Sequence, residues 1–378
     1  MKKRRSVTPA VEDSGLVDSQ QQTESLKGLL TIADLHAAAL EILPKGISDF
    51  LDGGAGNEIT LRANEASYDA VQFRPRVLRN VASIDTATRV LGSPIQFPIL
   101  LGPAGAHRLF HPDGELAYAR AAAELGTGIV VSTSSSVSLE DIATVGPELR
   151  WFQVYCYKDR SITRHLLERA QASGYAAICL TVDAPRHGQR LRNLRNQFSI
   201  PSHIRRANFE GINDELLGRN ADLTTHIREN HDASLSWRDI EWMKSVSRLP
   251  LVLKGILDPD DAVLAAEAGV AGIVVSNHGG RQLDGTPPSI TVLPPIKDAV
   301  GDRLEVYLDG GIRRGGDVVK SIALGAQAVL VARPYLWGLT VGGQAGVHHA
   351  LELLRTELVL TMALMGASSL AELQGRAI

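Results

Sequence analysis

Residues 305–334 read EVYLDGGIRRGGDVVKSIALGAQAVLVARP, and this stretch decides the fold class of the chain. Two short apolar runs, Glu305–Ile312 and Ala328–Pro334, stand on either side of a segment with helical apolar spacing, Gly316–Leu324. Short runs rich in valine and leucine are typical of parallel strands that are buried on both faces. The stretch therefore predicts a strand–helix–strand unit.

The same rhythm extends back to residue 98. Six earlier apolar runs are Pro98–Gly105, Gly128–Ser134, Arg150–Tyr157, Ala177–Ala184, Leu249–Ile256 and Gly272–Gly279. Helix-patterned segments between them include Gly114–Leu125, Ser161–Ser173 and Pro259–Ala268. Eight strand–helix units in about 240 residues predict an α/β fold, a (β/α)8 TIM barrel. A doubly wound open sheet is the alternative.

The regions outside this repeat suggest how the chain is organised. Residues 1–28 are polar and predict a flexible tail, whereas 29–378 predict one barrel domain with C-terminal helices. Within it, 29–97 predict an N-terminal cap of helices and a short strand pair. The charged, weakly periodic stretch Leu191–Ser234 follows the fourth run. Its position predicts a long loop that serves as an active-site lid.

Composition limits the classes of partner. The net charge of −3 and the pI near 6.4 give no reason to expect nucleic acid or a membrane surface. No apolar run reaches the ~18 residues that a membrane-spanning helix needs, and the basic start, Met1–Arg5, has no apolar stretch after it. Cys156 and Cys179 lie in apolar runs and predict buried thiols. We therefore expect a cytoplasmic protein that binds small molecules.

Polar residues gather where the apolar runs end. One buried polar side chain could be a satisfied core group, but the ends of many barrel strands meet on one face, where barrel enzymes bind their substrates. The pattern predicts an active site built from Ser132, Gln153, Tyr155, Thr181, Asp183, Lys254, Ser276, His278, Asp309, Arg313 and Arg333.

The last two units indicate a phosphate site. Glycines in Leu308–Arg313 let backbone N–H groups approach phosphate oxygens, and Arg313 and Arg333 supply charge. Without the arginines, these glycines would be equally consistent with ordinary tight turns that bind nothing. The sixth run adds a second kind of site, because His278 offers a proton acceptor close to the carboxylate anchor Arg281. Asp183 is expected to orient His278.

Four long motifs resemble one enzyme family. They are SNHGGRQLDG at 276–285, LDGGIRRGGDVVKSIALGA at 308–326, WFQVYCYKDR at 151–160 and LTVDAPRHGQR at 180–190. From about Leu30 to Ala371 the chain resembles the FMN-dependent (S)-2-hydroxy-acid oxidase and dehydrogenase family, which includes glycolate oxidase, lactate oxidase and mandelate dehydrogenase. The resemblance implies FMN as cofactor, a 2-hydroxy acid as substrate, oxygen or another electron acceptor, and a homotetramer or homo-octamer.

The resemblance also implies residue roles. His278 would be the base with Asp183 as its partner, Arg190 and Arg281 would bind the substrate carboxylate, and Tyr155 would hydrogen-bond the substrate oxygen. Lys254 would lie by the flavin N1–C2 carbonyl edge, where its charge stabilises the reduced flavin. The remaining flavin contacts would be Pro103, Ala104, Gly105, Ser132, Gln153, Thr181 and Ser276 at the ring, Tyr155 beside it, Asp309 at the ribityl chain, and Gly311, Arg313, Ala332 and Arg333 at the phosphate.

Three pocket positions depart from the glycolate and lactate oxidases. Phe50 stands at the substrate tyrosine, Ser134 stands at an aromatic position, and Gly105 stands where short-chain oxidases tend to carry alanine. Together they predict a roomier, more apolar pocket for an aryl or long-chain acid. Ala332 replaces a glycine of the phosphate motif, which a negative φ would accommodate.

Two other functions fit parts of the sequence. A phosphate-binding barrel could run an isomerase or aldolase reaction without redox chemistry, with Lys254 as the reactive amine. Phe50 also raises the alternative of a flavin protein that acts on a non-standard substrate such as a modified peptide. The combination of His278, Asp183, Arg281 and Arg190 favours the oxidase.

Overall fold

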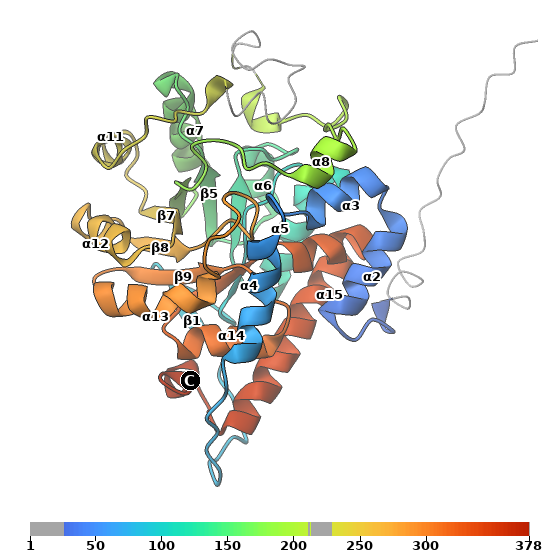
Figure 1. Cartoon of the computed structure of the whole chain (residues 1–378), viewed down its shortest axis with the longest axis vertical. Helices are drawn as coiled ribbons and strands as arrows, with labels where there is room; N and C mark the ends of the chain where they lie inside the picture. The colour runs from blue at the N-terminus through green and yellow to red at the C-terminus, as the bar shows by residue number, and fades with distance from the viewer. Residues whose placement is uncertain (1–25, 211, 213–228, 378) are drawn as a thin grey trace, which may run out of the picture.

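A closed barrel of parallel strands lies at the centre of the protein (Figure 1). The computed structural model describes residues 26–210, 212 and 229–377. The barrel strands pair in the order β10-β3-β4-β5-β6-β7-β8-β9, so the predicted TIM barrel is confirmed and the open sheet is excluded. They are β3 (Ile99–Leu101), β4 (Ile129–Ser132), β5 (Arg150–Val154), β6 (Ala177–Thr181), β7 (Leu251–Ile256), β8 (Gly272–Val275), β9 (Glu305–Asp309) and β10 (Ala328–Val331).

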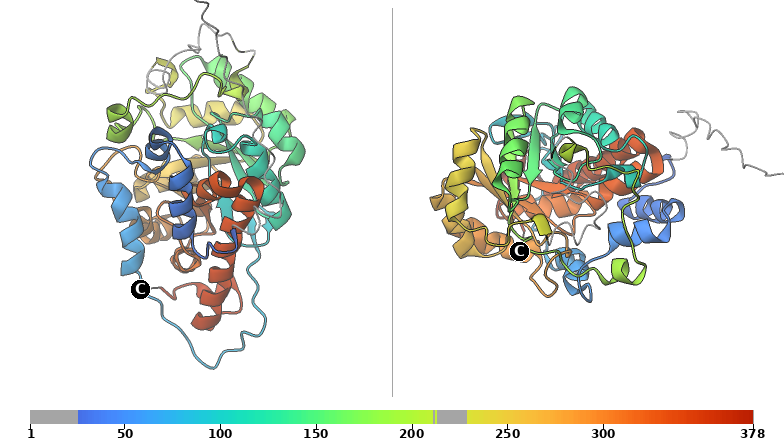
Figure 2. Two further views of the ribbon diagram at one scale, coloured as in Figure 1. Left: turned by 90° about the vertical axis from the view of Figure 1, so that its right-hand side faces the viewer. Right: turned by 90° about the horizontal axis from the view of Figure 1, so that it is seen from above.

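Helices surround the strands when the molecule is seen from above (Figure 2, right). They are α5 (Glu115–Leu125), α6 (Leu139–Val145), α7 (Arg160–Ala172), α11 (Arg238–Val246), α12 (Pro259–Glu267), α13 (Ser289–Val300), α14 (Gly315–Ala323) and α15 (Arg333–Met365). The start of α12 follows local rules, because the Asp258 side chain accepts from the Asp260 N–H and Pro259 fills the first turn. Among the described residues, none of the helices combines the length and apolar character of a bilayer-spanning segment.

The N-terminal part contains the predicted helices and strand pair. Its elements are α2 (Ile32–Ile42), α3 (Lys45–Asp52), α4 (Ile59–Ala70), β1 (Thr88–Val90) and β2 (Ser93–Ile95). Helix α2 lies beside α15 (Figure 1). Leu26, within the predicted tail, is buried against Gly342 of α15. The rest of that tail, 1–25, lies outside the described residues. The short elements between barrel units are η1 (His107–Leu109), α8 (Leu191–Arg195), η2 (Ala207–Phe209) and, near the C-terminus, η3 (Leu370–Leu373).

The barrel interior explains why polar residues collect at one end. One apolar layer of the interior is formed by side chains that pack in a single buried cluster: Leu100, Val130, Trp151, Cys179, Val252, Val274, Tyr307 and Leu330. Strand side chains alternate faces with a period of two, so the next inward position lies two residues further on. Those positions are Gly102, Ser132, Gln153, Thr181, Lys254, Ser276, Asp309 and Ala332. The chain therefore places a largely polar layer on top of an apolar one. Cys156 and Cys179 are buried and free, as predicted.

Candidate active site

A cavity opens above this polar layer, at the carboxyl ends of the strands. Most predicted site residues line it: Phe50, Pro103, Ala104, Gly105, Ser132, Ser134, Gln153, Tyr155, Thr181, Arg190, Lys254, His278, Arg281, Asp309, Gly311, Arg313, Ala332 and Arg333. The other two, Asp183 and Ser276, lie behind the lining, where Asp183 contacts His278 and Ser276 contacts Lys254. The structure thus brings the whole predicted set together.

Lys254 is a buried cation at the floor of the cavity. Its Nζ lies 2.8 Å from Asp309 Oδ2 and donates to Ser276 Oγ at 2.8 Å. Burial alone would lower the pKa of Lys254, but the charges of Asp309 and Asp183 raise it above the ordinary value. A reactive amine needs a lowered pKa. The structure therefore gives no support to the aldolase alternative.

Amide and hydroxyl groups form a fixed polar row beside Lys254. Gln153 Nε2 donates to Thr181 Oγ1 at 2.9 Å, and Ser132 Oγ donates to Gln153 Oε1 at 3.3 Å. The strand register sets this row, because Ser132 pairs with Gln153 and Thr181 pairs with Lys254 across neighbouring strands. Such a row can match the polar edge of a planar heterocycle.

His278 and Asp183 form the predicted pair. His278 Nδ1 lies 2.9 Å from Asp183 Oδ1, which leaves Nε2 for the cavity. Burial lowers the pKa of His278, and the Asp183 carboxylate opposes that shift. The pKa of Asp183 is lowered because the attraction of His278 outweighs burial. The backbone at His278 is left-handed, with φ of 59°, which is a strained conformation that often marks functional residues.

Two buried arginines face the same space. Arg281 donates to three backbone carbonyls at the end of α3: those of Phe50 at 2.8 Å, Leu51 at 3.1 Å and Gly53 at 2.7 Å. Arg190 is buried, and its Nε has no hydrogen-bond partner within the described residues. Burial lowers the pKa of each arginine, that of Arg190 to about 10. Neither forms an ion pair with a carboxylate in the described part of the chain. The site can therefore accept an anion.

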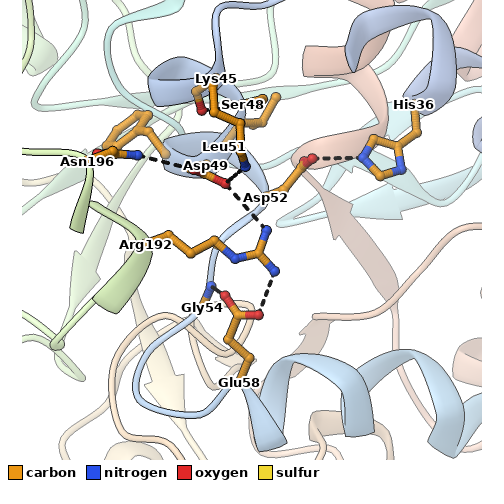
Figure 3. A network of polar contacts seen from close by, with 12 residues as sticks. His36, Lys45, Ser48, Asp49, Leu51, Asp52, Gly54, Glu58, Arg192 and Asn196 are labelled. Atoms are coloured by element: carbon orange, nitrogen blue, oxygen red, sulfur yellow. Dashed lines mark hydrogen bonds and ion pairs between the residues drawn. The ribbon is translucent and has the colours of Figure 1, made fainter. Parts of the chain in front are cut away.

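A polar network connects helices α3 and α8 (Figure 3). Arg192, in α8, binds Glu58 at 2.6 Å and lies 3.8 Å from Asp49 of α3. Asn196 Nδ2 donates to the same Asp49 at 3.2 Å. Because Arg190 precedes α8 and the carbonyls that hold Arg281 end α3, this network joins the two segments that carry the anion-binding groups.

The far end of the cavity holds a second cationic pair. Arg333 donates to the carbonyls of Leu51, Gly279 and Gly53, and Arg313 binds Glu65 at 2.7 Å. Burial, together with the charge of Arg313, lowers the pKa of Arg333 to about 10. Two buried cations that repel each other are stabilised by an anion between them.

Comparison with known proteins identifies the chain. A model of the FMN-dependent dehydrogenase family matches residues 39–378. The chain belongs to this family. L-lactate oxidase from a Nostoc species is 52% identical over 332 residues, which cover 86% of this chain and 91% of that protein. Human 2-hydroxyacid oxidase 1 is 46% identical over 350 residues, covering 91% and 95% of the two chains.

Solved structures agree with the sequence comparison. A mandelate oxidase structure superimposes with a TM-score of 0.86 at 44% identity and covers 92% of this chain and 98% of that one. The protein is thus an FMN-dependent oxidoreductase of the 2-hydroxy-acid oxidase family, as its motifs predicted.

The cavity of this FMN-dependent dehydrogenase fits its cofactor. The phosphate would balance Arg313 and Arg333. Gly311 has φ of 82°, and a Cβ there would lie 2.0 Å from the Asn64 carbonyl oxygen, so only glycine lets helix α4 approach this turn. Asp309 Oδ1 is buried and without a partner among the described residues, as an acceptor for a ribityl hydroxyl would be. Ala332 has φ of −124°, which accommodates its methyl group as predicted.

The three unusual pocket residues, Phe50, Gly105 and Ser134, contact neighbouring side chains of the cavity. Phe50 stacks on Phe198 with ring centroids 4.8 Å apart, and the Arg281 guanidinium lies 5.4 Å from its ring centre. A Cβ on Gly105 would lie 2.8 Å from Ser134 Cβ. The methyl group missing at Gly105 therefore makes room for Ser134.

Sequence reasoning missed two histidines of the lining, His187 and His231. His231 stacks on Tyr155 with centroids 4.5 Å apart. The signals were present, since His187 lies within the motif at 180–190 and His231 lies in the polar stretch Leu191–Ser234. Ile200 from that stretch also lines the cavity. The centre of the predicted lid, 213–228, lies outside the described residues.

Proposed function

We propose that this protein oxidises an (S)-2-hydroxy acid with an aryl or long-chain side chain to the 2-oxo acid. The observation that supports this is a cavity that brings the His278–Asp183 pair to Arg190 and Arg281, two arginines that form no ion pair with a carboxylate of the described residues. FMN, when bound, accepts the two electrons that leave the substrate carbon. The protein supplies orientation, charge and a proton acceptor.

The proposed roles follow from the contacts. Arg190 and Arg281 bind the substrate carboxylate, and the carbonyls around Arg281 fix the direction of its guanidinium. Tyr155, whose pKa burial and Asp183 raise to about 12, stays protonated and donates a hydrogen bond to the substrate oxygen. His278 Nε2 accepts one proton, and Asp183 stabilises the imidazolium that forms. Lys254 holds a positive charge beside the row of Ser132, Gln153, Thr181 and Ser276.

The size of the substrate is proposed from the walls of the cavity. Ser134 leaves space that an aromatic residue would fill, and Phe110 and Ile200 add apolar surface. A mandelate oxidase that is 43% identical to this chain has been solved with (S)-mandelic acid. Both observations support an aryl or long-chain acid over glycolate.

One experiment tests the proposed reaction. Holoenzyme would be mixed anaerobically with glycolate, lactate, mandelate and 2-hydroxyoctanoate, and bleaching of the flavin absorbance would be followed before oxygen is admitted. We expect fast bleaching by the larger acids. Lack of bleaching by every free acid would instead favour the modified-peptide alternative. The rate of recovery under oxygen tells an oxidase from an enzyme with another acceptor.

We also propose that the protein is a homo-oligomer and lies in the cytoplasm. Family resemblance supports a homotetramer or homo-octamer, which light scattering of the holoenzyme would measure. The free, buried thiols of Cys156 and Cys179 support a reducing compartment such as the cytoplasm.

We expect Arg333→Ala to weaken FMN retention. The change deletes a buried charge at the proposed phosphate end, and it leaves Arg281 as the remaining donor to the carbonyls of Leu51 and Gly53. Flavin occupancy after dialysis measures the effect, and Arg164→Ala on the exposed face of α7 is the matched control. Equal occupancy in the two variants would refute the assignment.

The rate of flavin reduction should fall at acid pH, where His278 becomes protonated, and this fall, the acid limb of the profile, should lie at low pH. The base must be neutral, and burial lowers the pKa of His278 below the ordinary histidine value. We therefore expect more than half of the plateau rate at pH 6.5 and a decline as the pH falls through the lowered pKa. Asp183→Asn removes the charge that raises this pKa, so the limb should move to still lower pH while the plateau rate drops. A limb above pH 7 in the wild type would contradict this.

A further inference from the structure

A buried network of polar side chains lies behind one wall of the cavity, and the proposed mechanism uses none of its members. They are Glu115 at the start of α5, His107 in η1, Ser136 after β4 and Tyr335 in α15, and each is at most 2% exposed. A buried carboxylate is costly unless hydrogen bonds and an opposite charge compensate for lost water. The contacts of Glu115 therefore show what this part of the protein holds in place.

The Glu115 carboxylate joins the loop after β3 to the loop after β4. Its Oε1 accepts from the backbone N–H groups of His107 at 3.1 Å and Ser136 at 2.8 Å, and its Oε2 accepts from Ser136 Oγ at 2.6 Å. Burial would raise the pKa of Glu115, but the attraction of His107 and the hydrogen bonds from His107 and Ser136 lower it to about 2. The carboxylate is therefore charged at any working pH and accepts all of these bonds.

His107 and Tyr335 extend the network to the other end of the loop after β3. His107 Nδ1 lies 3.0 Å from Glu115 Oε1, and Nε2 lies 3.1 Å from the Tyr335 hydroxyl. That hydroxyl donates to the Gly102 carbonyl at 2.9 Å, so its oxygen is left to accept a hydrogen from Nε2. The His107 ring also stacks on Tyr118 with centroids 4.7 Å apart. The network thus holds both ends of the segment 102–107.

The segment between these two ends faces the space for the cofactor. Pro103, Ala104 and Gly105 line the cavity at the positions assigned to the flavin ring. Ala106 follows them with a left-handed backbone, φ of 57°, and such strain at a residue other than glycine persists only where the surrounding structure imposes it. The Ala106 N–H donates to the Ser134 carbonyl at 3.0 Å. Contacts with neighbouring elements, rather than local preference, therefore determine where this backbone lies.

We propose that Glu115 and Tyr335, acting through His107, are positioning residues that fix the backbone of residues 103–105 against the flavin ring. This rests on the proposed function, in which that backbone contacts the ring. Electron transfer from the substrate carbon depends steeply on geometry, since a displacement of about 1 Å can cost ~100-fold in rate. Retention of FMN depends instead on the charges of Arg313 and Arg333 at the far end of the cavity.

Tyr335→Phe tests the proposal most sharply, because it removes one hydroxyl and retains the ring. We expect the variant to keep FMN after dialysis and to shift the visible absorbance and circular dichroism of the oxidised flavin. Anaerobic flavin reduction at a saturating 2-hydroxy acid should slow about 10-fold. Tyr118→Phe is the matched control, since the Tyr118 ring stacks on the same histidine but its hydroxyl makes none of the contacts that hold the segment.

Glu115→Gln tests the other end of the network. It retains an acceptor for the two backbone N–H groups but removes the charge, and it should also shift the flavin spectrum and slow reduction. A lower melting temperature in both variants, with the flavin spectrum and the reduction rate unchanged, would show a role in stability alone and overturn the proposal. Equal effects in Tyr118→Phe would overturn it as well. If no acid reduces the wild type, the proposed function fails, whereas the flavin spectra of the variants still decide the positioning role.

Discussion

His278→Ala is expected to retain FMN and to lower the rate of flavin reduction ~100-fold or more, because a positioned base typically contributes ~10²–10⁴-fold. The structure strengthens this expectation. Asp183 Oδ1 holds Nδ1 at 2.9 Å, so the ring presents Nε2 to the cavity in a fixed orientation. Stopped-flow reduction with a saturating 2-hydroxy acid measures the change, and the flavin spectrum reports that the cofactor remains bound.

The backbone at this position requires a second variant. With φ of 59°, His278 occupies a conformation that alanine disfavours by ~1 kcal/mol and that asparagine tolerates better. His278→Asn should therefore fold well and still reduce slowly. His165→Ala, on the exposed face of α7, controls for loss of a histidine elsewhere. Reduction near the wild-type rate in either His278 variant would remove this residue from the mechanism.

The barrel and its polar rim could be predicted because both depend on local periodicity. An apolar run of strand length indicates a buried strand. Because strand side chains alternate with a period of two, the residue two positions after an inward-facing one also faces inward, as Gln153 does after Trp151 and Lys254 does after Val252. Parallel strands then place their carboxyl ends together. The residue types at those ends, above all Lys254, His278 and Asp309, indicated chemistry before any contact was known.

Other features depend on contacts between distant segments and have no local signature. Arg281 is held by backbone carbonyls at the end of α3, and such contacts cannot be predicted from residue types because every residue has a carbonyl. The methyl group missing at Gly105 is compensated by Ser134, which only the approach of two loops shows. His187 and His231 looked like ordinary polar loop residues, because their position on the cavity wall depends on how the long loop returns to β7.

Substrate choice should follow from the space at Ser134. We expect kcat/KM for mandelate to exceed that for glycolate on the order of 10- to 100-fold, because burying an aromatic ring contributes ~1.5–3 kcal/mol and tenfold corresponds to ~1.4 kcal/mol. Steady-state or reductive kinetics with both acids measure this ratio. Glycolate as the best substrate of the wild type would show that the pocket has been misinterpreted, although membership of the family would stand.

Ser134→Trp tests the origin of the preference. The Cβ at position 134 already packs against Gly105, so the added indole ring must extend into the cavity. We expect it to reduce kcat/KM for mandelate ~10-fold or more and to affect glycolate less. Ser134→Ala removes the hydroxyl without adding bulk and should keep mandelate ahead of glycolate. Phe50→Tyr adds a hydroxyl near Arg281 and should favour small acids, which depend most on contacts to the carboxylate. An unchanged ranking in Ser134→Trp would mean that the substrate side chain points away from Ser134, toward the long loop.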